Sequence, residues 1–501
     1  MLNAKSRFSS TMMLGAILFL GASLCLAAPN DTKKATPPPP PRPAAAPARP
    51  APAQHNTVAP NNNQRPMPNT GGAGGFHANP PVNNGGFHAN PPAGGAGNMR
   101  PNNMSPAAAP RFAQGRAPVG ANRVARPNGD MLQRRPNGRV SDVHNARLGM
   151  DVHHGLMGGS RVEVVRPGGV RIVAERGRPG FVAHPFDRQF GGHAFAARTY
   201  YYHGRPYERF YRTYGYHGMA IEVFAPAHYY SVGFYGWAYH PWGRPVAYAW
   251  GWGPSPWYGY YGGYFAPYPT YAGPNYWLTD YMIANDLQAE YQANMEANTM
   301  GAPMMAGGPM ITPEVKQQIS AEVANQIALE NYEAQQNAAG QDADPASSGI
   351  ARMLSDGRPH VFVAGSDLDV VNLAGQECAL TPGDVLQFNP PVDPNGVSAN
   401  LVVLASKGGP ECRRADTVAV ALNDLQEMQN QMRQTIDDGL AKLQAQQGQG
   451  GLPPAPPSAQ VAPSNAQFTS IAPPPDPDVA TELSQQESQA ATAETEVSAG
   501  S

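Results

Sequence analysis

The stretch RVEVVRPGGVRIV, residues 161–173, decides the fold of the middle of the chain. Apolar and charged side chains alternate in residues 161–166 and again in residues 170–173, and Pro167-Gly168-Gly169 separates the two runs. Alternation with a period of two indicates a strand with one buried face, and a Pro-Gly turn between two such runs indicates a reversal of the chain. The stretch therefore predicts an antiparallel β-hairpin.

Similar patterns continue after this hairpin. Further strand-like runs lie at residues 199–202, 205–211 and 219–224, separated by His203-Gly204 and His217-Gly218. Short strands joined by glycine-bearing turns favour an antiparallel β meander, which we expect to begin near residue 160.

Tyrosine and tryptophan are concentrated in residues 200–291, which hold 21 of the 22 tyrosines and all six tryptophans. Gly or Pro interrupts this segment every few residues, so we do not expect regular helix there. Each aromatic ring buries about 150–250 Å² with few rotatable bonds, so the rings can form a compact irregular cap. We therefore predict an aromatic-rich antiparallel β region over residues 160–277.

A helical connector is expected over residues 278–340. Thr279 is a candidate N-cap for a first helix, and Thr312 followed by Pro313 is a stronger start for a second. In the second helix, apolar residues recur at intervals of four and form one apolar face: Val315, Ile319, Val323 and Ile327. This face either packs on the chain's own domains or mediates self-association as a coiled coil through residues 313–329.

After a linker at residues 341–358, the β pattern returns over residues 359–445. Six short strand-like runs precede a helical pattern, and Thr381-Pro382-Gly383-Asp384 fits a type II turn with Gly383 at positive φ. These runs predict a small SH3-like or barrel-like β module. Asn423 and Gln426 are expected to cap its closing helix, and residues 425–443 of that helix offer a second route to self-association.

The two ends of the chain differ from the middle. Residues 1–28 resemble a secretory signal, with Lys5 and Arg7 before an apolar run of 15 residues that is too short to span a membrane. Residues 29–159 are rich in Pro, Gly, Asn and Arg, and residues 446–501 are rich in Pro, Ala, Gln and acidic residues. We expect both segments to be disordered, which makes the chain multidomain and largely disordered. The apolar stretches after the signal are also too short to span a membrane.

The formal net charge of −2 conceals a strong division along the chain. Residues 28–199 hold 21 basic and 7 acidic residues, whereas residues 301–501 hold 8 basic and 24 acidic residues. We expect the two segments to attract each other, within or between chains, at low salt.

Two cysteines, Cys378 and Cys412, remain after the expected signal cleavage. In an oxidising compartment a disulfide between them is favoured over a thiol nucleophile or a metal pair. The expected location is therefore the periplasm or the cell surface.

Three sequence blocks resemble a group of uncharacterised secreted bacterial proteins: residues 235–242, the Tyr276–Tyr281 junction and residues 378–384. The resemblance extends over roughly residues 160–445. It implies export and a modular layout, and it brings no established activity and no site residues. The Leu-Thr-Pro-Gly-Asp block at residues 380–384 is also similar to turns in SH3-like and other small β-barrels.

The sequence contains no catalytic signature. It lacks a Gly-x-Ser-x-Gly elbow, a His-Glu-x-x-His helix, a phosphate loop and a dinucleotide fingerprint, and nine of its 13 histidines are spread over residues 144–240 without metal-ligand spacing. We therefore predict no catalytic residues, no metal and no cofactor. Nucleic acid is not an expected partner because the chain is exported.

Exposed rings combined with cations suit a sugar polymer or an anionic envelope polymer. The candidate ligand-binding residues come from the aromatic segment and from a strand with several arginines: Trp237, Trp242, Trp250, Trp252, Trp257, Arg205, Arg209 and Arg212. We predict a non-enzymatic structural or interaction protein of the cell envelope that binds polysaccharide, peptidoglycan or partner proteins. One alternative is that the rings only pack internally, and another is a hydrolase or metal-dependent enzyme within residues 160–277.

Overall fold

A computed structural model describes residues 117–175, 178–186, 192–202, 204–297, 311–393 and 396–499. These residues all belong to one compact unit, residues 94–501. The expected secretory signal, and the part of the expected disordered segment that precedes residue 117, lie outside the described residues.

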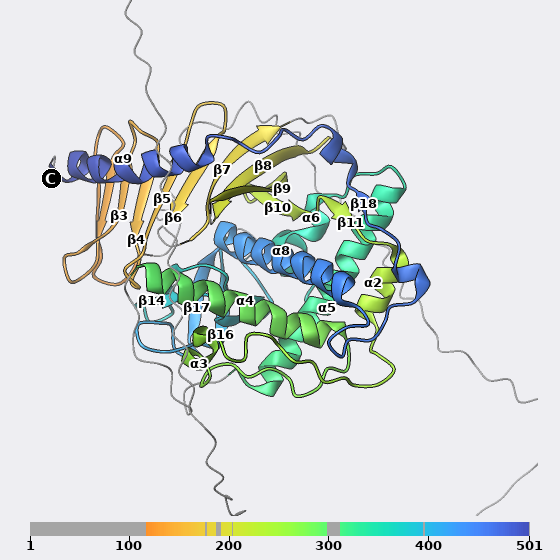
Figure 1. Ribbon diagram of the computed structural model, residues 1–501. Coiled ribbons are helices and arrows are strands. Elements are labelled where there is room, and N and C mark those ends of the chain that lie inside the picture. The colour runs from red at the N-terminus through yellow and green to blue at the C-terminus, as the bar shows by residue number, and fades with distance from the viewer. Residues whose placement is uncertain are drawn as a thin grey trace, which may run out of the picture. The chain divides into compact units, whose positions relative to one another are not determined.

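Ten antiparallel strands form one sheet in which every strand pairs with its neighbours in sequence (Figure 1). The strands are β1 (Asn122–Ala125), β2 (Met131–Arg134), β3 (Val140–Asn145), β4 (Met150–His154), β5 (Ser160–Val165), β6 (Arg171–Glu175), β7 (Gly180–Phe186), β8 (Ala194–Tyr202), β9 (Arg205–Tyr216) and β10 (Met219–Ala225). The predicted meander is confirmed, and the hairpin of residues 161–173 is its β5–β6 pair.

The sheet begins earlier than the sequence patterns indicate. Residues 122–154 form strands β1 to β4, so the prediction of disorder up to residue 159 is wrong for this part. The turns after β1 and β2 close on Gly129 and Gly138, both at positive φ, a conformation that glycine adopts without strain. Each of these short strands buries few apolar side chains of its own, so its sequence shows little apolar periodicity.

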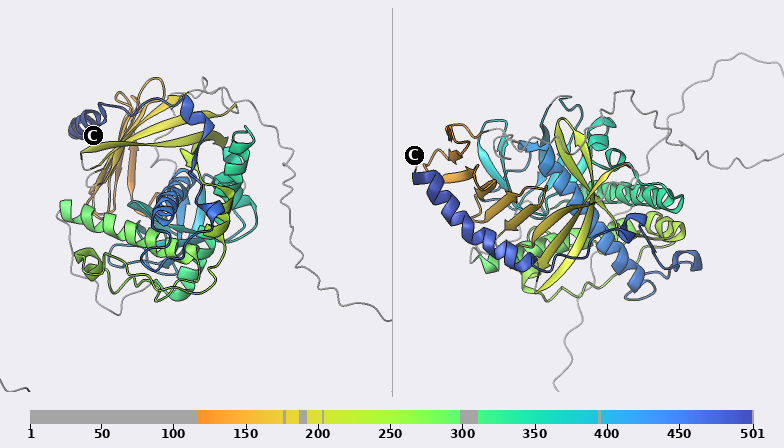
Figure 2. Two further views of the ribbon diagram at one scale, coloured as in Figure 1. Left: turned by 45° about the vertical axis from the view of Figure 1, so that its right-hand side comes forward. Right: turned by 90° about the horizontal axis from the view of Figure 1, so that it is seen from above.

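Helix α9 (Val479–Ala499) lies along one face of the sheet, as Figure 2 shows. It packs Val479, Leu483 and Val497 against apolar side chains of the strands, such as Val162 and Val164. The prediction of a disordered tail at residues 446–501 is therefore wrong for its described part, since Leu452, Ala459 and Phe468 are also buried in the main core. Because the helix is rich in Ala, Gln and Glu, its docking depends on the sheet beneath it, which composition does not reveal.

Seven further helices are α2 (Val232–Tyr239), α3 (Pro256–Tyr260), α4 (Pro274–Glu296), α5 (Pro313–Ala338), α6 (Pro345–Ser348), α7 (Ile350–Ser355) and α8 (Leu422–Gln446). The side chain of Thr312 accepts a hydrogen bond from the N–H of Val315, which confirms the predicted cap of α5. The other two caps are wrong. Helix α4 begins at Pro274 after Gly273, so Thr279 lies inside it. Helix α8 begins at Leu422, and Gln426 instead accepts from the N–H of Ile350.

The apolar faces of α5 and α8 lie in the main core of the chain. Val315, Ile319, Val323 and Ile327 of α5 are buried there together with Leu425, Met428, Met432, Ile436, Leu440 and Leu443 of α8. The stripes expected to mediate self-association through residues 313–329 or 425–443 are thus occupied within the chain. None of the helices among the described residues is long and apolar enough to cross a membrane.

The second sheet has six strands in the order β12-β15-β16-β17-β13-β14. They are β12 (His360–Val363), β13 (Leu368–Asn372), β14 (Glu377–Leu380), β15 (Val385–Phe388), β16 (Ser398–Ala405) and β17 (Thr417–Ala421), which confirms the six predicted runs. The barrel is wrong, because β12 and β14 stand at opposite edges of an open sheet. The edge strand β14 pairs instead with a loop, where the N–H of Cys412 donates to the carbonyl of Ala379 (2.9 Å).

The predicted disulfide is confirmed: Cys378 and Cys412 are bonded, with Cα atoms 4.9 Å apart. The predicted turn is confirmed as well, since Gly383 has φ +87° and the N–H of Asp384 donates to the carbonyl of Thr381 (3.0 Å). Both features hold the loops of the second sheet in place.

Candidate functional site

A column of stacked rings runs through the aromatic segment. The centroid of Trp252 lies 5.3 Å from that of Trp250, Trp250 lies 5.0 Å from Trp277, and Trp277 lies 5.4 Å from Tyr281. Trp277 is fully buried, whereas Trp250 and Trp252 are partly accessible. The column therefore leads from the core toward the surface.

Hydrogen bonds fix this column to the core. The indole N–H of Trp250 donates to the hydroxyl of Tyr271 (2.6 Å), and that hydroxyl donates to Asp280 (2.8 Å). Asp280 pairs with Lys316 at 2.6 Å, and all of these partners except Trp250 are buried. The segment also contains the helices α2 and α3, so the expectation of no regular helix there is wrong. The result is a fixed ring cluster in which Trp250 and Trp252 are partly accessible.

The predicted ligand-binding residues do not form one surface. Trp242 and Trp257 are buried, and Trp237 joins Trp250 and Trp252 as partly buried rings. The three arginines lie on β9 instead.

Each arginine of β9 has its own surroundings. Arg205 is exposed, Arg209 pairs with Asp438 at 2.7 Å, and Arg212 is buried in an ion pair with Asp342 at 2.8 Å. Arg212 is therefore a core residue, and ligand binding by the accessible members of the set stays a prediction.

Ion pairs such as Arg135–Asp369 and Arg178–Asp367 join the basic residues 28–199 to the acidic residues 301–501 within one chain, and the attraction expected at low salt stays a prediction. One cluster of ion pairs is the Arg178 hub, defined here as Arg178 with Glu175, Glu290 and Asp367. Their N–O distances are 3.1, 2.6 and 2.9 Å, respectively. Burial raises the pKa of Asp367 to about 7 although Arg178 attracts its charge. One cation thus serves three carboxyl groups.

A second hub surrounds Arg135, which pairs with Asp369 at 2.7 Å and with Glu377 at 2.8 Å. His153 lies between Asp142 and Asp369 at 2.7 and 3.2 Å. Burial opposes a charge on this ring, but hydrogen bonds and attraction from the two carboxylates raise the pKa of His153 to about 10. The hub has a structural role, because it links the turn after β2, and strand β4, to the second sheet.

A pocket with mixed polar chemistry lies where residues 473–477 cross the sheet. This tail pocket has a volume of ≈ 320 Å³, and its described lining comprises His184, Ala197, Thr199, Glu208, Pro473, Pro474, Asp476 and Pro477. Strand pairing brings the polar groups together, since Thr199 of β8 lies opposite Glu208 of β9 and His184 of β7 lies opposite Ala197.

Hydrogen bonds hold the tail over this pocket. Nε2 of His184 lies 2.8 Å from Oδ2 of Asp476, and the N–H of Asp476 donates to Oγ1 of Thr199 at 2.9 Å. The other carboxylate oxygen of Asp476 accepts from the N–H of Asp478 at 2.8 Å. Both oxygens of Asp476 are therefore used within the chain.

Glu208 has no such support. Its Oε1 is buried without a hydrogen-bond partner, and burial raises the pKa of Glu208 to about 7. Sequence reasoning missed Glu208 and Asp476 and counted His184 only among the scattered histidines. No local pattern could reveal them, because the tail reaches the pocket from almost 300 residues further along the chain.

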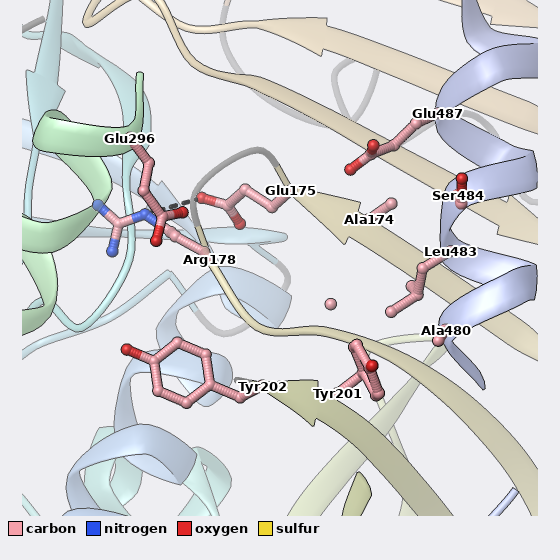
Figure 3. A pocket seen from close by; sticks show the side chains of 11 residues that line it. Ala174, Glu175, Arg178, Tyr201, Tyr202, Glu296, Ala480, Leu483, Ser484 and Glu487 are labelled. Carbon is pink, nitrogen blue, oxygen red and sulfur yellow. Dashed lines mark ion pairs between the residues drawn. The ribbon is translucent and has the colours of Figure 1, made fainter. Parts of the chain in front are cut away.

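A second open pocket, of ≈ 300 Å³, lies between α9, the β6–β8 strands and the end of α4 (Figure 3). Glu175 and Arg178 of the Arg178 hub are at one side of it, and Glu487 of α9 faces them across the opening. Tyr201 and Tyr202 form a further wall. Its polar groups are mainly rim carboxylates and the hub itself, so it has little independent chemistry.

Within the described ranges, no group of three or more His, Cys, Asp or Glu side chains is arranged to hold a metal ion. A scan against protein-family models finds no model that matches the chain. Searches of the curated proteins and of the solved structures likewise find no protein that matches.

Proposed function

We propose that the protein is an exported, non-enzymatic binding protein of the cell envelope that holds a polysaccharide chain on the accessible rings of its aromatic segment. The observation that carries the proposal is the column of stacked rings whose outer member, Trp252, is partly accessible on the surface although it also packs against the buried Trp257 (5.2 Å between centroids). Next to this ring lies Tyr258, whose centroid is 4.7 Å away and which is also partly accessible.

A fixed indole is well suited to sugar binding. The apolar C–H face of a sugar ring packs against an aromatic face, and rings that are already ordered lose little conformational entropy when they bind. Trp250 and Trp252 are held by the stack and by the hydrogen bond to Tyr271, so their positions are set before a ligand arrives. This arrangement favours a neutral sugar face over a purely ionic contact.

Charge has a smaller role than the sequence indicates. Arg244 is the single Lys or Arg within residues 231–273, and it is exposed, whereas Arg209 and Arg212 are engaged in ion pairs elsewhere. We therefore expect polymer binding that depends only weakly on salt. The disulfide supports an oxidising compartment, in agreement with the expected export.

A pull-down of the full chain with insoluble peptidoglycan and with outer-membrane polysaccharide tests this proposal. Trp252→Ala is expected to lose at least 80% of the retained protein, about one kcal/mol or more of binding free energy, while the chain stays folded. Tyr332→Ala is the matched control, because Tyr332 is 54% exposed on α5 and belongs to none of the ring contacts of the aromatic segment. Equal retention of the Trp252 variant and the wild type would refute the proposal, as would a wild type that binds neither polymer.

A further inference from the structure

We propose that the side chains of Lys407 and Asp384 condense spontaneously to an intramolecular amide bond, with Glu411 as the proton carrier. The proposal is independent of the polysaccharide surface and adds a self-catalysed covalent cross-link to the second sheet. It follows from three buried side chains that meet at one corner of that sheet.

Strand pairing brings Lys407 and Asp384 together. Asp384 ends the turn between β14 and β15, and Lys407 lies just after β16. Because Val385 of β15 lies opposite Ala405 of β16, the two side chains meet at the same end of the strand pair. Nζ of Lys407 lies 2.6 Å from Oδ1 of Asp384. A contact this short places the nitrogen about 3–3.5 Å from the carboxyl carbon Cγ, which is the separation of reacting atoms in a near-attack arrangement.

The pair is shielded from water. The side chain of Asp384 is fully buried, and those of Lys407 and Glu411 are 6% and 3% exposed, respectively. The buried ring of Tyr264 lies over the ammonium group, with 5.2 Å between Nζ and the ring centroid. Burial makes two separate charges costly, and it keeps water away from an amide once it has formed. Both effects favour condensation.

The carboxyl group of Asp384 is held in position for attack. Its Oδ2 accepts a hydrogen bond from the N–H of Thr381 at 2.9 Å, which stabilises the negative charge that develops on this oxygen when an amine adds to Cγ. Nζ of Lys407 also donates to the carbonyl of Pro382 at 3.0 Å, which orients the amine. Burial raises the pKa of Asp384 to about 8 although Lys407 attracts its charge, so the protonated acid is accessible near neutral pH.

Glu411 is placed to carry a proton away from the nitrogen. Its Oε1 lies 3.5 Å from Nζ of Lys407 and accepts from the hydroxyl of Thr381 at 2.6 Å. Its Oε2 accepts from the N–H groups of Lys407 and Gly408 and from the hydroxyl of Ser406. This carboxylate is therefore fixed beside the reacting nitrogen before the reaction begins.

The condensation moves two protons and releases one water molecule. One ammonium proton passes from Nζ of Lys407 to Oδ1 of Asp384, which leaves a neutral amine beside a carboxylic acid. The amine adds to Cγ, Glu411 transfers a second proton from the nitrogen to Oδ1, and the Cγ–Oδ1 bond breaks as water leaves. Burial opposes the charge on Lys407, but the two carboxylates raise the pKa of its amine, so the ion pair is the resting form and the bond is expected to form slowly after folding.

A second buried pair is an internal control. Nζ of Lys316 also lies 2.6 Å from a carboxylate, that of Asp280, and both side chains are buried. Among the described residues, Asp280 is the single carboxylate that pairs with Lys316, so a second acid to carry the proton is missing there. We expect this pair to remain an ion pair.

Peptide mapping of the full chain by mass spectrometry, after prolonged incubation at neutral pH and reduction of the disulfide, tests the proposal. Trypsin cuts after a free lysine, so an unbonded Lys407 yields residues 353–407 and 408–413 as separate peptides. A bonded Lys407 resists the cut, and residues 353–413 stay together and are lighter by one water molecule. A further cut by chymotrypsin after Phe388 should leave two peptides joined through Asp384 and Lys407. Trypsin is expected to cut after Lys316 as usual.

Two variants identify the responsible groups. Lys407→Arg keeps the positive charge and is expected to abolish the joined peptides, with unchanged retention on polysaccharide. Glu411→Gln keeps the shape of the side chain and is expected to slow bond formation at least tenfold in chains that circular dichroism shows to be folded. Lys442→Arg is the matched control, because Lys442 is exposed on α8, and it should form the bond as the wild type does.

Three results would overturn the proposal: complete cutting after Lys407 in the wild type, a loss of water without joined peptides, or bond formation at the wild-type rate in folded Glu411→Gln. The wild-type map alone can refute the bond, so the test does not depend on the folding of a variant. Failure of the wild type to bind polysaccharide, with the joined peptides present, would refute only the proposed function.

Discussion

Replacing Arg178 by methionine tests whether the Arg178 hub stabilises the contact between the sheet and the rest of the chain. The Arg178 side chain is 8% exposed and pairs with Glu175 of β6, Glu290 of α4 and Asp367, which precedes β13. Methionine keeps much of the stem volume and removes the charge. The three carboxyl groups then remain close together without a cation, which disfavours their ionised forms.

Removing one partner of a buried ion pair costs about 3–5 kcal/mol, because the remaining charges are left uncompensated. Glu290 is the most buried of the three carboxyl groups, at 3% exposure, and lies 2.6 Å from Arg178. We therefore expect Arg178→Met to lower the free energy of unfolding by about 3–5 kcal/mol at pH 7. The loss is expected to be smaller at pH 5, because protonation of Asp367, whose pKa burial already raises to about 7, relieves part of the repulsion.

Urea unfolding of the full chain, followed by circular dichroism at pH 5 and pH 7, measures both values. Arg205→Met is the matched control, because Arg205 is exposed on β9, and it is expected to stay within about 0.5 kcal/mol of the wild type at both pH values. A loss below 1 kcal/mol at pH 7 would refute the role of the hub. A loss of the same size at both pH values would show that packing, and not the uncompensated carboxylates, is responsible.

Three further predictions concern the disulfide, the tail helix and the buried acids. Alkylation of the native protein is expected to leave its intact mass unchanged, and two reactive thiols would contradict the disulfide. The double variant Cys378→Ser with Cys412→Ser is expected to lower the free energy of unfolding in urea by about 3–4 kcal/mol, because it loses a cross-link over 34 residues. Hydrogen exchange of the α9 amides is expected to become faster between 0.05 and 0.5 M NaCl, because the ion pairs Arg147–Glu496 and Arg166–Glu482 join the helix to the sheet. The exchange of buried β7 amides should not change. Salt-independent exchange in α9 would show that the apolar contacts alone hold the helix. Burial raises the pKa of Asp437 to about 7 and that of Asp384, where its carboxyl group is free, to about 8. The stability that these protonated groups contribute is fully present below their unfolded-state pKa near 4 and is lost as the pH rises through 7 and 8. The urea midpoint should therefore fall between pH 5 and pH 8, and Asp437→Asn should make this fall smaller; an unchanged pH dependence in the variant would count against the prediction.

Local patterns predicted much of the secondary structure correctly. The hairpin at residues 161–173, the cap at Thr312, the turn at Gly383 and the six strands of the second sheet each depend on neighbours within a few residues. Such features are encoded where they occur, because alternation, capping and positive φ are local properties of the backbone. The disulfide was predictable for a different reason, since only two cysteines remain to be paired.

Segments that need a distant partner were misjudged. Strands β1 to β4 and helix α9 both look disordered by composition, yet each buries its few apolar residues against the other. The barrel prediction failed in the same way, because strand order is set by which edges pair and not by the number of strands. The predicted ligand-binding surface of tryptophan and arginine side chains also depended on contacts between residues far apart in the sequence, which a local sequence pattern does not contain.

The sequence alone determined the local elements, the charge division and the pair of cysteines, because these require only the identity and order of nearby residues or a count along the chain. Only the tertiary structure decided which charges are paired, which rings are buried and which groups share a pocket. Glu208, His184 and Asp476 illustrate the reason: they belong to β9, β7 and the tail, respectively, and they line one cavity only because the strands pair and the tail crosses them. Burial then raises the pKa of Glu208, and this shift exists only once the fold has removed the side chain from water.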